Sequence, residues 1–101
     1  MMFQSYEPAV KLIQTRAREN KKQGYKELAI GSVFRMLRDN SAFSLFGDYP
    51  LLGIAVDEIQ KAGFEVRRSA LFKVMRQSAE LSWLSQKDRI ALTNQLLGVR
   101  Y

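Results

Sequence analysis

The sequence predicts an all-α fold: a single compact domain of about five helices, with at most a minor β element. Apolar residues recur every three or four positions along most of the chain, which is the spacing of one face of an α-helix. Glycines, prolines and small polar residues divide this pattern into segments of helical length. A chain of 101 residues has room for one modest core, so we expect residues 1–101 to form one domain.

Two helices are predicted in the first half of the chain. The first runs from about Tyr6 to Lys22, with Ser5 as a candidate N-cap, and Gly24 is placed to end it. The second runs from about Lys26 to Arg38. Its apolar face consists of four residues at helical spacing: Ile30, Val33, Phe34 and Leu37.

The connector "SAFSLFGDYP", residues 41–50, mixes aromatic residues with turn formers. A short strand and a single helical turn both fit this composition. We interpret its apolar residues, Phe43, Leu45, Phe46 and Tyr49, as a core plug between the two halves of the chain. The alternative is that the same four residues form a docking surface.

Three helices are predicted in the second half. The third begins at Asp48, just before Pro50, and ends at Gly63. The fourth covers about 68–81, and the "GFEV" segment between the two, residues 63–66, is the best candidate for a strand. Ser85 and Asp88 have the spacing of a capping box, which predicts a fifth helix that runs to about Leu97.

A seven-residue word occurs twice, as "SVFRMLR" at 32–38 and as "ALFKVMR" at 70–76, 38 positions later. Each copy follows a proline, an amphipathic helix and a turn with glycine and an aromatic residue. One hypothesis is an internal duplication of two helix-turn-helix halves. The alternative is one packing pattern that any amphipathic helix adopts. In both, the basic residues of each word point away from the apolar face.

The sequence contains few of the residue types that enzymes use for catalysis. It contains no histidine and no cysteine, so general bases and nucleophiles are reduced to carboxylates, lysine and tyrosine. Asp57 and Glu58 are adjacent and point about 100° apart on a helix, so they cannot face each other as an acid and base pair. Glu58 and Lys61 are interpreted as a surface ion pair. We predict neither an enzyme nor a cofactor, and no metal site, because the carboxylates do not cluster.

Positive charge is the most informative feature of the composition. Sixteen lysines and arginines against ten acidic residues leave a net charge of +6. The basic residues concentrate in 1–40 and 61–76, whereas 41–60 holds three acidic residues and no basic one. This balance favours a polyanionic partner such as nucleic acid.

The segment 56–76 resembles a helix-turn-helix unit in outline, because a glycine turn precedes a basic helix. It departs from the common motif at Ile59, where a small residue is usual, and at Ser69, where a branched apolar residue is usual. Only a variant with a longer turn fits.

We therefore predict a DNA-binding regulator or accessory factor that acts as a homodimer, with DNA a better candidate than RNA. The predicted phosphate contacts are Lys11, Arg18, Lys21, Lys22 and Lys73. The predicted base-edge or groove contacts are Arg67, Arg68 and Arg76.

Several alternatives stay open. Arg67 and Arg68 could instead pair with Asp57 or Glu58, and Arg76 with Glu80 four residues later. The single tryptophan, Trp83, is interpreted as a core or self-association residue rather than a base-stacking platform.

The alternative function is an interaction protein, an adaptor or inhibitor that docks on a larger enzyme complex. The chain has no recognisable signal peptide, and its longest apolar run is too short to span a bilayer. We expect a soluble cytoplasmic protein that does not bind membranes.

Overall fold

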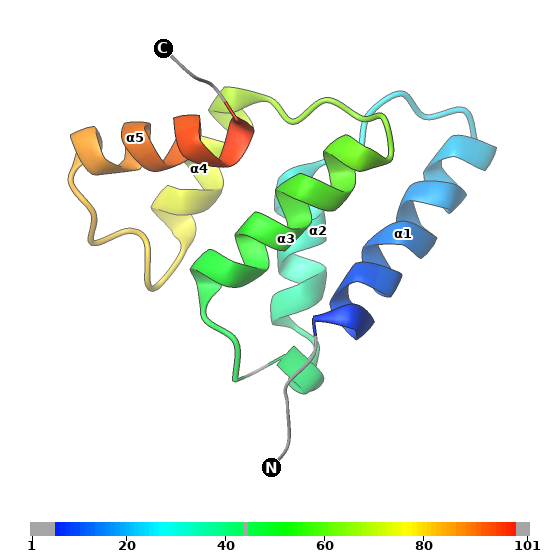
Figure 1. The fold of residues 1–101 in the computed structure, drawn as a ribbon, viewed down its shortest axis with the longest axis horizontal. Coiled ribbons are helices and arrows are strands. Elements are labelled where there is room, and N and C mark those ends of the chain that lie inside the picture. Colours follow the sequence, from blue (N-terminus) through cyan, green and yellow to red (C-terminus); the bar gives the residue numbers. More distant parts are fainter. Residues whose placement is uncertain (1–5, 44, 99–101) are drawn as a thin grey trace.

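Five α-helices and one turn of 3-10 helix make up most of the folded chain (Figure 1). The computed structural model describes residues 6–43 and 45–98, and no strand occurs in these ranges. The elements are α1 (Glu7–Lys22), α2 (Ile30–Arg38), η1 (Ser41–Phe43), α3 (Asp48–Lys61), α4 (Arg68–Gln77) and α5 (Gln86–Leu97). The predicted all-α class with five helices is confirmed.

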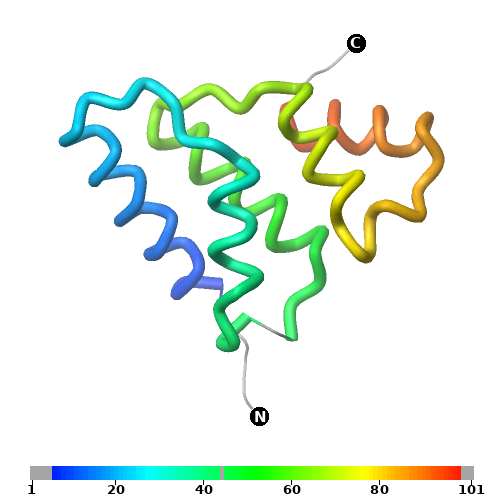
Figure 2. The backbone as a smooth tube through the Cα atoms, turned by 180° about the vertical axis from the view of Figure 1, so that it is seen from behind, coloured from blue at the N-terminus to red at the C-terminus, as the bar shows by residue number. Residues whose placement is uncertain are grey.

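The helices stack in two layers. In one layer α1 packs against α3, and α3 packs against α5. In the other layer α2 packs against α4, and Figure 2 shows these two helices side by side from behind. The layers are joined because α2 also packs on α3, and α4 packs on α5. Helices of the same layer thus alternate along the sequence, as they do in stacked helical hairpins.

The core lies around α3, the helix with neighbours on most sides. Five of its apolar side chains are buried: Leu51, Leu52, Ala55, Val56 and Ile59. The predicted core face of α2 is confirmed, since all four of its apolar residues are buried. Phe43 is buried as the core-plug interpretation expects, whereas Leu45 is 77% exposed.

Local signals set most of the helix ends. Gly24, Gly63 and Gly98 all have positive φ angles, and they follow α1, α3 and α5 as predicted. The Ser85 hydroxyl accepts a hydrogen bond from the backbone N–H of Asp88 at 3.1 Å, which confirms the predicted cap of α5. The candidate cap Ser5 lies outside the described residues.

Two predicted boundaries are wrong. The second helix begins at Ile30 rather than Lys26, because Ala29 is extended and the chain before it carries Leu28 into the core. The fourth helix ends at Gln77 rather than Leu81, because Ser78 is extended and its hydroxyl donates to the Asp48 carboxylate. Long-range contacts decide both ends.

The structure shows the conformation of two segments for which the sequence left the secondary structure open. The connector contains one helical turn, η1, and no strand among its described residues. The "GFEV" segment is irregular chain between α3 and α4, with Phe64 and Val66 buried.

Candidate nucleic-acid interface

The two copies of the repeated word form the two adjacent helices α2 and α4. In α2, Val33, Phe34 and Leu37 are buried, while Arg35 and Arg38 are exposed. In α4, Leu71, Val74 and Met75 are buried, and Lys73 and Arg76 are exposed. The apolar residues of the repeated word therefore pack in the core, and its basic residues are exposed to solvent.

We call the solvent-exposed basic residues of these two helices the α2–α4 basic face. It consists of Arg35, Arg38, Arg68, Lys73 and Arg76. Neither α2 nor α4 contains an aspartate or a glutamate. Because the two helices pack side by side, this charge is gathered in one layer of the molecule.

A groove of about 370 Å³ runs between α2 and α4. Its walls are Gly31, Phe34, Arg35, Arg38, Asp39, Val74, Gln77 and Ala79. Arginines therefore stand on the α2 side, and Gln77 supplies a polar group on the α4 side. Lys73 and Arg76 are the sequence neighbours of Val74 and Gln77, and both are exposed.

One acidic residue from another segment, Asp48, neutralises part of this face. Arg38 Nη1 lies 2.7 Å from Oδ2 of Asp48, at the start of α3. Within residues 6–43 and 45–98, no ion pair is found for Arg35, Lys73 or Arg76. These three cations are available to an external anion.

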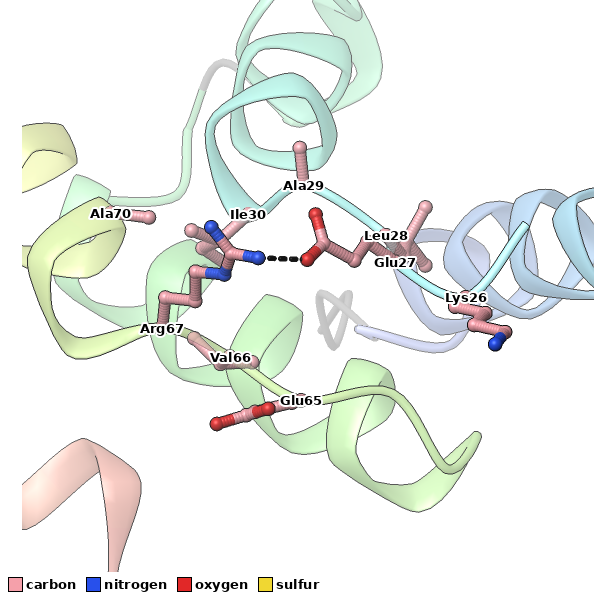
Figure 3. Close-up of a pocket in the computed structure, with 9 residues that line it drawn as sticks. All are labelled: Lys26, Glu27, Leu28, Ala29, Ile30, Glu65, Val66, Arg67 and Ala70. Atoms are coloured by element: carbon pink, nitrogen blue, oxygen red, sulfur yellow. Dashed lines mark hydrogen bonds and ion pairs between the residues drawn. The ribbon is translucent and has the colours of Figure 1, made fainter.

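Arg67 precedes α4 and forms an ion pair with Glu27, in the segment between α1 and α2 (Figure 3). The two side chains bridge a pocket of about 350 Å³ between the α1–α2 and α3–α4 connections. The alternative pairing with Asp57 or Glu58 does not form. Arg68, the next residue, is exposed and lines a different groove, beside α5.

The predicted residues of α1 lie apart from α4. Figures 1 and 2 show α1 on one side of α3, and α4 on the other. Lys11 pairs with Glu7 at 3.4 Å, and Lys21 Nζ lies 5.6 Å from the centre of the Phe64 ring. Arg18 and Lys22 are exposed on the same helix. The eight predicted residues therefore fall into two groups, one on α1 and one at α4.

Arg18 and Lys21 also border a groove of about 340 Å³ between α1 and α3. Its carboxylate is Glu58, which is buried and accepts from Gln14 Nε2 at 3.2 Å. Lys61 Nζ lies 2.9 Å from Asp57 Oδ2 and 3.5 Å from Glu58 Oε2. The predicted pair with Glu58 therefore forms, but it is not a surface pair, because the Glu58 side chain is buried. The hydrogen bond with Asp57, together with the negative charge of both carboxylates, raises the pKa of Lys61.

The α3 and α4 pair differs from a standard helix-turn-helix. The two helices are joined by residues 62–67, whereas the standard motif uses a turn of about three or four residues. The main neighbours of α4 are α2 and α5. The surface available to a ligand is thus the broad side of the second layer.

Three features of this region were not anticipated from the sequence. Arg35 and Arg38 were not among the predicted site residues, although the repeated word contains both. Trp83 is 88% exposed, so its interpretation as a core residue is wrong. Glu80 does not form an ion pair with Arg76; its carboxylate accepts from the backbone N–H of Asp48 at 2.8 Å.

In the ranges that the structure describes, no cluster of acidic side chains could hold a metal ion. No described helix is both long enough and apolar enough to cross a bilayer. Comparisons with known proteins found no matching family model, no matching curated protein and no matching solved structure.

Proposed function

We propose that this protein binds nucleic acid through the α2–α4 basic face, with duplex DNA as the first candidate. The observation that supports this most is the presence of five exposed basic residues, and no acidic residue, on two adjacent helices. Cations gathered on one surface replace the counterions of a phosphate backbone, and the release of those counterions drives binding. Such binding requires no catalytic step, so we propose that the protein acts as a regulator or accessory factor.

Arg35, Lys73 and Arg76 are the proposed phosphate contacts, because they are exposed and have no acidic partner among the described residues. Arg68 lies in the first turn of α4, where the helix dipole also favours an anion. A single face of this size buries little DNA surface, so we propose that a homodimer binds.

The test is fluorescence anisotropy of a labelled duplex with the full chain, at two salt concentrations. The triple variant Arg35→Ala/Lys73→Ala/Arg76→Ala should bind at least tenfold more weakly and reduce the salt slope by about 3. The control, Lys11→Ala/Lys22→Ala/Lys87→Ala, removes the same charge from exposed positions outside the face. An equal loss in both variants would mean that net charge, or α1, is responsible instead.

A second candidate function is docking on a larger protein. It is favoured by two strongly exposed apolar side chains, Trp83 at 88% and Leu45 at 77%. Under this alternative, the duplex does not bind even at low salt.

A further inference from the structure

Equivalent positions of the repeated word are covered by a neighbouring helix on α2 but not on the side of α4 that faces away from α2. The repeat aligns Gly31 with Ser69 and Phe34 with Phe72, each pair 38 positions apart. On α2, Gly31 and Phe34 line the groove toward α4. A Cβ atom on Gly31 would lie 3.6 Å from Val74 Cγ2, which shows how closely α4 approaches there.

On α4, Ser69 and Phe72 line an open groove beside α5. Its other lining residues are Glu65, Arg67, Arg68 and Ile90, and its volume is about 760 Å³. Phe34 is only 6% exposed because α4 covers it, whereas Phe72 is only partly buried. Ile90 on α5 is 41% exposed. The groove therefore has an apolar floor that no described helix covers.

The stacking order explains this floor. In the second layer, α4 lies against the Phe34 side of α2. A further helix, placed in the same way, would lie against the Phe72 side of α4. The Arg89 guanidinium lies on that side, 5.5 Å from the centre of the Phe72 ring. Arg89 is held there by hydrogen bonds to the carbonyl oxygens of Leu84 and Ser82, at 2.7 and 3.2 Å.

The charge around the groove selects the chemistry of the occupant. Arg68 lines it and Arg89 lies over the Phe72 ring, against one acidic lining residue, Glu65. Arg67 also lines it, but its charge is paired with Glu27. A second copy that presented its own α4 would bring the basic residues of both copies together, and that repulsion is unfavourable. An apolar helix face flanked by acidic residues complements both the floor and the rim.

We infer that the α4–α5 groove binds an amphipathic α-helix from a partner protein, with apolar residues on Phe72 and Ile90 and acidic residues toward Arg68. The bound helix takes the third place in the second layer. This inference rests on the second candidate function, protein docking. Arg68 is shared by the groove and the α2–α4 basic face, whereas Phe72 and Ile90 belong to the groove alone.

The probe is a displayed library of helical peptides about 16 residues long, selected on the full chain. The recovered peptides should carry apolar residues at i, i+3 or i+4 and i+7, flanked by aspartate or glutamate. We expect the affinity of these peptides for the protein, measured by fluorescence anisotropy, to fall roughly tenfold or more in the variants Phe72→Ala and Ile90→Glu. The control Tyr25→Ala, an exposed aromatic residue outside the groove, should leave affinity unchanged.

Ile90→Glu changes an exposed residue, so it decides the matter even if Phe72→Ala fails to fold. Recovered peptides that bind both groove variants as well as the wild type would overturn the inference, while leaving protein docking elsewhere open. Recovery of no peptide would also overturn it. A concentration-dependent dimer in sedimentation that Ile90→Glu dissociates would assign the groove to a second copy instead. DNA binding by Ile90→Glu reports separately on the α2–α4 basic face.

Discussion

Arg38 of α2 and Asp48 of α3 form an ion pair in which the Asp48 side chain is only 6% exposed. The same carboxylate accepts a hydrogen bond from the buried Ser78 hydroxyl, just after α4. Glu80 accepts from the backbone N–H of Asp48 and so caps α3 from a distant segment. These contacts join three helix ends at one point.

Removal of the Asp48 carboxylate should therefore destabilise the fold. We expect Asp48→Ala to lower the free energy of unfolding by about 2–3 kcal/mol, because Arg38 and Ser78 lose their partner. Arg38 is 40% exposed, which limits the cost. Urea unfolding measures the change. Lys11→Ala, which breaks an exposed pair with Glu7, should change stability by less than about 0.5 kcal/mol. Equal effects would contradict the structural role of Asp48.

Two glycines should respond to alanine with opposite signs. Gly24 has a φ of +79° and open space around it, so Gly24→Ala should destabilise by about 1 kcal/mol through backbone strain alone. Gly53 lies inside α3, and a Cβ there would make an ordinary contact of 3.7 Å with Leu96 Cδ2. Gly53→Ala should stabilise by about 0.5–1 kcal/mol. Thermal unfolding of both variants tests the two expectations. A shift of the melting temperature in the same direction for both would argue against the backbone conformations of Gly24 and Gly53 described above.

Trp83 offers a direct optical test, since it is the single tryptophan of the chain. At 88% exposure, its fluorescence in dilute native protein should be quenched by iodide nearly as well as in urea. Trp83→Ala should change the free energy of unfolding by less than about 0.5 kcal/mol. Shielding that appears only at high protein concentration would support self-association through this residue. Shielding at every concentration would contradict the exposed position.

Arg67 and Arg68 should differ in DNA binding although they are adjacent. Arg67 is engaged by Glu27, whereas Arg68 is exposed on the basic face and has no ion pair among the described residues. We expect Arg68→Ala to reduce the salt slope of binding by about 1, and Arg67→Ala to change it much less. Titrations of one duplex at several salt concentrations measure both slopes. A loss of equal size would show that Glu27 releases Arg67 to the DNA.

Local signals predicted most of the helices. Ser85 with Asp88 and Gly98 bound α5, and Gly24 and Gly63 end α1 and α3, because caps and left-handed turns depend on residues close in sequence. The four apolar residues of α2 identify its buried face for the same reason.

The sequence by itself determined the all-α class, the main helix positions and the alternation of buried and basic residues in the repeated word. Only the tertiary structure decided that α4 ends at Gln77, where Ser78 binds Asp48 thirty positions away. It also placed Arg35 beside α4, and α1, the helix that carries Lys11, on the far side of α3. Helix periodicity is a local property, whereas the neighbours of a charged face depend on which helices pack together to bury their apolar sides.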